Sequence, residues 1–337
     1  SMLNYRIQRI PYSIKLGMSV ILMMVLFGMA LAFGAADTSV KDVLSALLST
    51  APNDQAIMLR EIRFPREVAA ALVGAALAVS GAIIQGMTRN PLADPGLLGL
   101  TAGANAALAI TVAFWPSVNY FGVMLTCFVG AAVGAILVFG FSSFHPEGFT
   151  TLRIVLAGAT ISAFLYAIAE GIGIYFKISQ QVSMWTAGGM IGTTWNQVLL
   201  IAPIVLVGII ISLMCSRQLT ILSLSEEMAV GLGQRVRLIK SILFVLVIVL
   251  TGASVALVGN LAFFGLMIPH IVRAIVGTDY RHVLPMSAFL GAAFMLLADT
   301  LARTINAPYE TPVAAVVAIM GLPFFLYIVR KGGQSFS

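Results

Sequence analysis

Charged side chains are scarce in this sequence. Of its 337 residues 9% are charged and 60% are hydrophobic, whereas about a quarter of the residues of a soluble domain are charged. This composition excludes an ordinary soluble enzyme, a disordered tail and a fibrous repeat, and the mean hydropathy of +1.01 indicates a chain embedded in lipid. The three histidines, His145, His270 and His282, stand too far apart to share a zinc ion at helical spacing, so no metal site is predicted.

The chain also lacks the motifs of ATP binding and of catalysis. No lysine follows a glycine, so a Gly-Lys-Ser/Thr phosphate loop is missing. Two isolated acids, Glu170 and Asp299, lie in or near apolar runs. Because carboxylates inside a membrane can mark proton relays, a proton-coupled carrier is one function to weigh. The net charge of +6 comes mainly from loops between apolar runs and implies no nucleic-acid partner.

Long uncharged runs predict the membrane spans, because a helix needs about 20 apolar residues to cross the hydrocarbon core. The polar and apolar alternation of a transmembrane β-barrel is not found. The sequence therefore predicts an all-α polytopic membrane protein of about ten transmembrane helices, with residues 1–337 as a single transmembrane domain. The uncharged runs cover residues 16–36, 68–88, 95–146, 154–169, 178–216, 241–272, 282–298 and 311–329.

Three of these runs are too long for one span. We divide the third at Pro116 and the sixth near Gly259, because proline and glycine interrupt helices. The fifth holds one full span at about 195–215, after a short helix at 185–190. The run 16–36 also resembles the core of a removable signal peptide, but its length favours a first span.

Ten spans place both termini on one side of the membrane. Thirteen of the 19 lysines and arginines then lie on that side, so the positive-inside rule predicts cytoplasmic termini. Three of the outer cations crowd into seven residues, against the rule. The outer cations are Lys41, Arg60, Arg63, Arg66, Lys177 and Arg303.

The densest pattern of polar and small residues runs from residue 60 to residue 103. Arg63 and Arg66 flank a proline at the predicted start of a span and share one helical face, so we expect both to point toward water. Small residues over 74–81 permit close approach of another helix, and Asn-Pro and Asp-Pro pairs within 90–95 predict a sharp turn. Snorkelling arginines and plain helix packing explain the same residues without a specific function.

The longest polar loop on the inner side covers residues 217–237. Ser225 can cap a short helix there, Glu226 and Glu227 fill its first turn, and Gly233 can end it. A solvated loop explains this composition equally well.

Further short motifs follow along the chain. In order, the motifs are Arg-Phe-Pro-Arg (63–66), Gly-Ala-Ala-Leu-Ala-Val-Ser-Gly (74–81), Gln85, Asn-Pro-Leu-Ala-Asp-Pro-Gly (90–96), Leu-Ala-Gly (156–158), Gly-Asn (259–260), Phe-Phe-Gly-Leu (263–266), Pro-His-Ile-Val-Arg (269–273), Asp299, Arg303, Glu-Thr-Pro (310–312) and Gly-Leu-Pro-Phe (321–324). In this order and spacing, the chain resembles the FecCD-type permeases, the membrane subunits of type II ABC importers for iron-siderophores, haem and cobalamin. Val313-Ala314 stands where many members carry Val-Gly.

The resemblance implies three sites. At the outer side, Arg63, Arg66 and Arg303 match arginines that receive acidic side chains of an extracytoplasmic substrate-binding protein, a role that suits the bidentate guanidinium group. On the inner side, the loop 217–237 matches the coupling helix that meets the ATPase subunit, with Glu226, Glu227, Ala229, Leu232 and Gly233. The third site is the gate and pathway, matched by Asn90, Leu92, Phe149, Thr150, Gly158 and Ser162; helix packing explains the glycines equally well.

The function implied is that of a permease subunit of a binding-protein-dependent ABC importer, which moves an iron-siderophore complex across the bacterial cytoplasmic membrane. Such a chain is not an enzyme and binds no cofactor, because ATP and Mg belong to a separate ATPase dimer. A second permease, identical or related, completes the channel. A haem or cobalamin permease of the same family is the alternative, and a proton-coupled secondary transporter is the alternative from another class.

Overall fold

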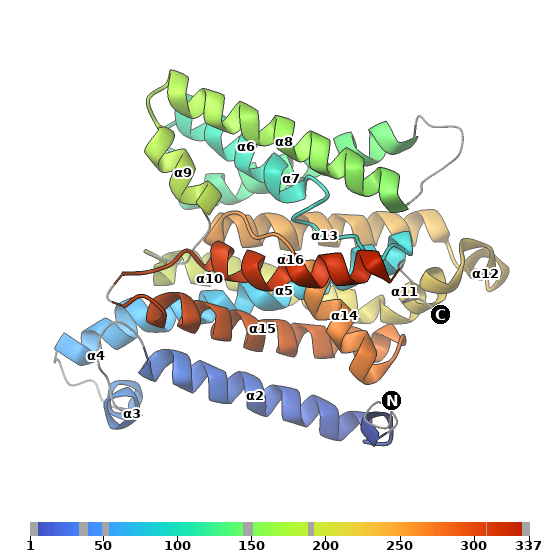
Figure 1. Ribbon diagram of the computed structural model, residues 1–337, viewed down its shortest axis with the longest axis horizontal. Coiled ribbons are helices and arrows are strands. Elements are labelled where there is room, and N and C mark those ends of the chain that lie inside the picture. Colours follow the sequence, from blue (N-terminus) through green and yellow to red (C-terminus); the bar gives the residue numbers. More distant parts are fainter. Residues whose placement is uncertain are drawn as a thin grey trace.

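The chain folds as a bundle of helices in a computed structural model that describes residues 6–33, 40–48, 54–143, 151–187, 192–307 and 309–331. Long helices run side by side along the longest axis (Figure 1), and no strand occurs within these ranges. In chain order the elements are α2 (Tyr12–Ala32), α3 (Val40–Leu48), α4 (Asp54–Met58), η1 (Leu59–Arg63), α5 (Phe64–Thr88), α6 (Leu100–Phe114), α7 (Tyr120–Ser143), α8 (Thr151–Tyr175), α9 (Ser179–Ala187), α10 (Trp195–Met214), α11 (Ser216–Leu224), α12 (Glu226–Gly231), α13 (Val236–Val258), α14 (Phe264–Val276), α15 (Tyr280–Thr304) and α16 (Val313–Arg330).

Ten of the described helices correspond to the predicted spans. Eight are long and apolar enough to cross a membrane, namely α2, α5, α7, α8, α10, α13, α15 and α16. The other two, α6 and α14, are apolar but have only 15 and 13 residues. The breaks at Pro116 and Gly259 are confirmed, because α6 ends before the first and α13 before the second. At about 20 Å, α14 covers only part of the membrane thickness.

Helix α5 is the centre of the bundle. It packs against α13, α14 and α15. In its apolar 18-residue stretch 78% of the residues are buried, compared with 17% in the corresponding stretch of α2 and 28% in those of α8, α10 and α16. A Cβ atom at Gly74 would overlap the carbonyl of Gly291 in α15, and one at Gly81 would overlap the carbonyl of Gly265 in α14. The prediction that the small residues 74–81 permit close helix approach is therefore confirmed.

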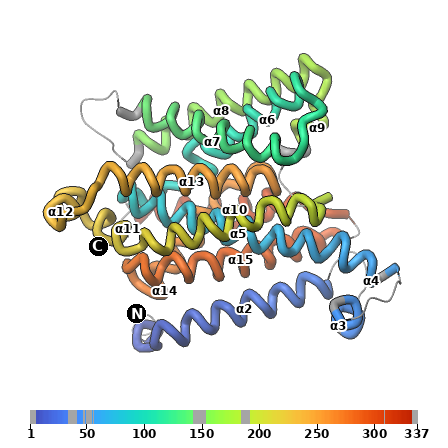
Figure 2. The backbone as a smooth tube through the Cα atoms, turned by 180° about the vertical axis from the view of Figure 1, so that it is seen from behind, coloured from blue at the N-terminus to red at the C-terminus, as the bar shows by residue number. Residues whose placement is uncertain are grey.

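Helices α6 to α9 form a second group beside α13, seen from behind in Figure 2. Helix α7 packs on α13, and α6 and α8 pack against α7. The short helix predicted before α10 corresponds to α9, which begins earlier, at Ser179.

A π-helical turn, η1, joins α4 to α5. Such a turn takes one more residue than an α-helical turn and weakens the local backbone hydrogen bonding. The indole N–H of Trp195, at the start of α10, donates to the carbonyl of Arg60 in this turn at 2.7 Å. An apolar cluster surrounds the turn and joins it to α2, α3 and α4, through Leu31, Ala32, Val43, Ala46, Ala56 and Leu59.

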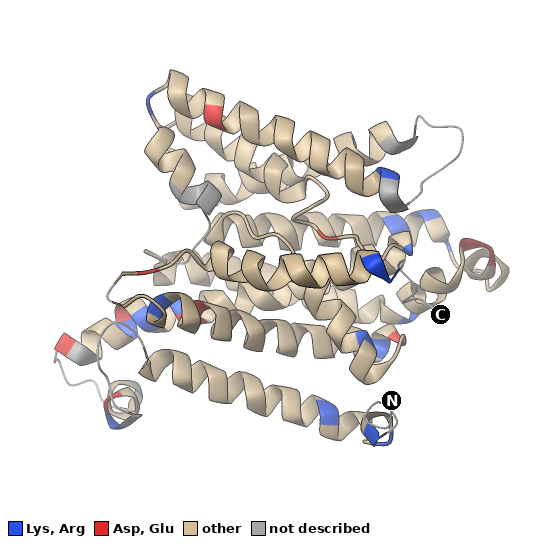
Figure 3. Cartoon of the chain, in the orientation of Figure 1, with Lys and Arg blue, Asp and Glu red and all other residues tan. Residues whose placement is uncertain are grey.

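Most charged residues lie near the two ends of the bundle, and few lie in its middle (Figure 3). We call one the α12 end, which holds α12, the start of α2 and the last turn of α16. The other is the α4 end, which holds α3, α4 and the last turn of α15.

Candidate functional site

The segment α11–α12 forms a compact projection at the α12 end. The Ser225 hydroxyl accepts a hydrogen bond from the Met228 backbone N–H at 3.0 Å, and the two glutamates Glu226 and Glu227 occupy the first turn of α12. Gly233 follows with a φ of 79°, a left-handed conformation that favours glycine. The predicted cap, acidic first turn and terminating glycine of this helix are therefore confirmed.

The exposed surface of α12 and of Leu232, which follows it, carries three large apolar side chains beside Glu227. Met228, Val230 and Leu232 are 48%, 63% and 65% exposed, whereas Ala229 is completely buried. Ala229 therefore packs inward and offers no side chain to a partner, and its part in ATPase coupling stays a prediction. Sequence reasoning missed Met228 and Val230, although their alternation with small residues in a polar loop was visible.

Three contacts tie this projection to the membrane helices, and a fourth closes the loop after α12 onto α11. Glu226 forms an ion pair with Lys240 of α13, and Gln234 donates to the carbonyl of Gln218 at 3.3 Å. The backbone N–H of Tyr280, at the start of α15, donates to Thr220 at 2.9 Å. The Arg89 guanidinium, directly after α5, donates to the carbonyl of Leu222 in α11 at 3.4 Å. Displacement of α11 and α12 as a unit therefore acts on α5, α13 and α15 together.

The turn after α5 carries two of the predicted gate residues. Asn90 closes the turn by accepting a hydrogen bond from the Leu92 backbone N–H at 2.9 Å. Leu92 belongs to an apolar cluster that joins α8, α14 and α16 at the α12 end, with Val155, Phe263, Leu266, Phe324, Phe325 and Ile328. The predicted gate residues Phe149 and Thr150 lie outside the described residues.

Buried polar groups hold this turn against the first turn of α14. Asp94 accepts a hydrogen bond from the Phe263 backbone N–H at 3.2 Å, so a carboxylate from the α5–α6 loop caps α14. Gln85 donates to the carbonyls of Ala93 and Gly265 at 3.0 and 3.1 Å, and its own carbonyl accepts from Arg273 at 2.7 Å. The gate turn and α14 are therefore joined as one unit.

The start of α15 carries its own cap at the same end. Asp279 accepts hydrogen bonds from the backbone N–H and the guanidinium of Arg281, at 3.0 and 2.7 Å. The bonds from the Arg281 side chain hold the pKa of the Asp279 carboxyl below its ordinary value.

At the α4 end, the predicted docking arginines lie in a buried ion-pair network. Arg66 pairs with Asp299 and with Glu310, each at 2.9 Å. Arg303 pairs with Glu67 at 2.9 Å and with Asp299 at 3.3 Å. The network links α5, α15 and the segment that leads into α16.

Arg63, Arg66 and Arg303 are only 8%, 9% and 3% exposed. Arg63 donates to the carbonyl of Leu31 at 2.8 Å, and Arg303 donates to that of Ala30 at the same distance. The expectation that the arginines point toward water is therefore wrong, because acids and carbonyls of neighbouring helices bind them inside the bundle.

The two predicted pathway residues of α8 face the protein. A Cβ atom at Gly158 would overlap the carbonyl of Leu97, and Ser162 is 8% exposed. This placement contradicts a role in lining a pathway between two permease copies. The exposed face of α8 carries other small side chains, Ala159, Thr160, Ala163, Ala167 and Gly171.

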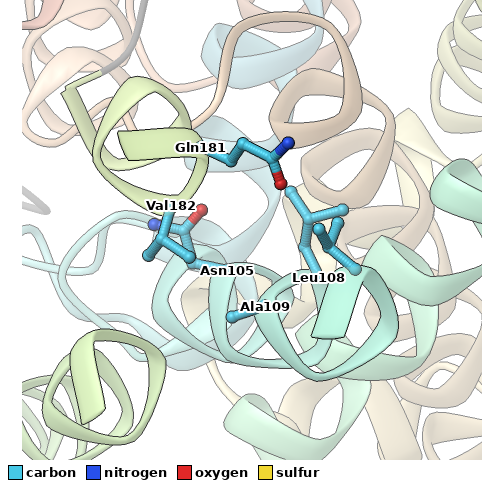
Figure 4. A pocket seen from close by; sticks show the side chains of 6 residues that line it. Asn105, Leu108, Ala109, Gln181 and Val182 are labelled. Carbon is cyan, nitrogen blue, oxygen red and sulfur yellow. The ribbon is translucent and has the colours of Figure 1, made fainter. Parts of the chain in front are cut away.

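The cavities differ greatly in size. One between α6 and α9 has a volume of about 10 Å³, room for about one water molecule, so it cannot hold a metal chelate. Asn105 and Leu108 of α6 and Gln181 and Val182 of α9 line it (Figure 4). A larger one of about 420 Å³ opens at the α12 end, lined by Met87, Thr88, Arg89, Phe139, Ile154, Glu226, Lys240, Ser241 and Phe244. It lies between the gate turn and α12.

The sequence profile of the FecCD transport family matches residues 22–331. The chain belongs to the FecCD transport family. The iron(3+)-hydroxamate import system permease protein FhuB of Bacillus subtilis is 43% identical over 304 residues, which cover 90% of this chain and 79% of that protein. The hemin transport system permease protein HmuU of Yersinia pestis is 36% identical, over 96% of this chain and 97% of that protein.

A solved structure of a metal-chelate type ABC transporter in an inward-facing conformation is similar to this FecCD chain throughout. The TM-score is 0.79 at 27% identity, and the match covers 95% of this chain and all of that one. The chain is thus a multi-pass membrane permease and not an enzyme. The two isolated acids give no support to a proton-coupled carrier: Asp299 is held by two arginines, and Glu170 lies exposed on α8.

Proposed function

We propose that this FecCD chain is the permease half of a binding-protein-dependent ABC importer that carries an iron-siderophore complex across the cytoplasmic membrane. The observation that carries the proposal is the projecting helix α12, whose apolar side chains Met228, Val230 and Leu232 are exposed at one end of the bundle. An exposed apolar patch rimmed by polar residues is typical of a protein interface. The partner we assign to it is an ABC ATPase dimer, which would bind the ATP and Mg.

The α12 end is assigned to the cytoplasm. The positive-inside rule supports this orientation, because 13 of the 19 lysines and arginines belong to that side in a ten-span topology. Both termini are then cytoplasmic, and the α4 end faces the binding protein.

The contacts at the α12 end supply a coupling route. When the ATPase dimer closes, it displaces α12 and the adjoining α11. Arg89, bound to the carbonyl of Leu222, passes this displacement to the gate turn. Leu92 then separates from Ile328 and the rest of its apolar cluster, which opens an apolar constriction on the cytoplasmic side.

At the α4 end, docking of a binding protein requires an exchange of ion-pair partners. Glu310 is the most exposed acid of the network, at 28% of its side chain, and it pairs with Arg66. A carboxylate of the binding protein that replaces Glu310 would reach Arg66 without disturbing the buried pair with Asp299. This exchange gives the predicted docking arginines a role that is compatible with their burial.

The substrate class follows from relatives that are named for iron(3+)-hydroxamate, Fe(3+)-citrate and hemin import. We favour an iron-siderophore and keep haem and cobalamin as candidates, since a cobalamin import permease of Halobacterium salinarum is also 38% identical. A second permease copy or a related chain completes the channel, and the exposed small-residue face of α8 is available to line it.

Transport in proteoliposomes tests the proposal. The chain is reconstituted with its ATPase and its binding protein and offered a panel of labelled iron-siderophore, haem and cobalamin. We expect uptake of the iron-siderophore that needs ATP and the binding protein. Uptake driven by a proton gradient without ATP would refute the ABC assignment, whereas ATP-driven uptake of haem alone would refute only the choice of substrate.

A further inference from the structure

A groove of about 350 Å³ lies at the α12 end between α11 and the start of α13. It is separate from the cavity beside the gate turn and shares no lining residue with it. Its lining residues are Arg217, Gln218, Ile221, Leu232, Gly233, Gln234, Arg235, Leu238 and Ile239.

The charge of this groove is of one sign. Arg217 and Arg235 are exposed, and neither belongs to an ion pair within the described ranges. No acid lines the groove. Of the two acids nearest along the chain, Glu226 is paired with Lys240, and Glu227 does not line the groove. Two guanidinium groups are thus available for an anion, and each can bind a phosphate in bidentate fashion.

The other wall of the groove is apolar and continues onto surfaces that face lipid. Ile221, Leu238 and Ile239 form this wall, and Leu238 is 50% exposed. Helix α11 follows directly on α10, whose last residue, Met214, is 74% exposed, and α13 carries Val245 at 56% exposure. An occupant therefore meets cations at one side and hydrocarbon at the other.

Two amide side chains complete the lining. The Oε1 atoms of Gln218 and Gln234 are buried and accept no hydrogen bond. These two oxygens are closed off from the open groove, so a hydroxyl donor of an occupant would reach them after rotation of the amides, which would remove the cost of a buried acceptor without a partner.

We propose that this groove binds the head group of an anionic glycerophospholipid, with the phosphate on Arg217 and Arg235, head-group hydroxyls near the two glutamines, and an acyl chain along the apolar wall. Free inorganic phosphate would leave the apolar wall uncovered. Basic pockets between helix ends are a known form of lipid recognition. The site lies next to α12 without including Met228 or Val230, and it shares Leu232 with the proposed ATPase surface, so lipid and ATPase would adjoin each other at that side chain.

Retention of phosphatidylglycerol by the full-length, detergent-purified chain tests this proposal by native mass spectrometry. The variant Arg217→Gln/Arg235→Gln is compared with Arg237→Gln/Arg330→Gln, which removes the same charge from exposed arginines of the same end that do not line the groove. We expect affinity to fall about fivefold per groove arginine, hence about twenty-five-fold for the pair, with the control near wild type. Ile239→Trp, which fills the groove without changing charge, should also release the lipid.

Equal loss in the groove pair and the control pair would overturn the proposal, because diffuse charge would then suffice. Displacement of the lipid by inorganic phosphate at equal concentration would overturn the role of the apolar wall. Unchanged lipid retention together with lost ATPase assembly in the groove variant would identify a protein site instead. Thermal unfolding of each variant, measured alongside, shows whether a loss of lipid reflects loss of the fold.

Discussion

Removal of the central acid of the α4-end network should be among the most destabilising conservative changes in the chain. Asp299 is fully buried and pairs with both Arg66 and Arg303. Together with Arg63, Glu67 and Glu310, the group holds three cations and three anions. The substitution Asp299→Asn leaves three cations with two anions, so one buried guanidinium charge is uncompensated.

The expected cost follows from that burial. Removing one partner of a buried pair costs about 3–5 kcal/mol, whereas an ion pair near the surface contributes about 1 kcal/mol or less. Glu310→Gln removes the same charge from the same network, but its side chain is 28% exposed, which makes it the matched control. Adding Arg66→Gln to Asp299→Asn should restore about 1–3 kcal/mol of the loss, because the charges then balance again.

The chain contains its own reporter for this measurement. Cys127 is completely buried and Cys215 is partly exposed, so Cys215→Ser leaves one thiol that a fluorescent maleimide reaches only on unfolding. Denaturant titration in detergent then gives the free energy of unfolding of each variant. A cost for Asp299→Asn no greater than that for Glu310→Gln would refute the inference that buried charge balance holds this end together.

Three further predictions concern assembly and transport. Met228→Glu/Val230→Glu should abolish ATPase binding in a pull-down while the melting temperature stays unchanged, because both side chains are exposed; normal binding would refute the α12 interface. Arg89→Ala should leave ATP hydrolysis intact but lower uptake by tenfold or more, and unchanged uptake per ATP would exclude the Arg89 route. Glu310→Gln should strengthen capture of the binding protein and Arg66→Glu should weaken it, as measured by surface plasmon resonance; unchanged capture in both would exclude partner exchange.

The helices were readable from the sequence because lipid imposes a simple rule on composition. Uncharged runs of sufficient length became helices, and Pro116 and Gly259 marked the breaks within the longest runs. Ser225 and Gly233 bounded α12 because capping depends on residues close in sequence. The gate turn was likewise local, since Asn90 binds the backbone two residues later.

The burial of the arginines could not be predicted from the local sequence in the same way. Arg66 stands 233 positions before Asp299, and nothing in the local pattern distinguishes a guanidinium that meets such a partner from one that snorkels to water. The burial of Ala229 could not be predicted for a similar reason, because the side of a six-residue helix that faces inward depends on how α11 and α13 hold it. The face of α8 that carries Gly158 was fixed by packing against Leu97 of the α5–α6 loop, a contact between segments far apart in the sequence.

The π-helical turn η1 sets the rotational phase of everything that precedes α5. Each residue of an α-helix turns the chain by about 100°, and the π-helical turn absorbs one surplus residue, so winding the same residues Leu59–Arg63 as an α-helix would rotate α4 by about that angle. Ala56 would leave the apolar cluster that it shares with Leu31 and Val43. The indole of Trp195 would lose the carbonyl of Arg60. The π-helical turn thus keeps the α3–α4 segment aligned with the end of α2 on the face assigned to the binding protein.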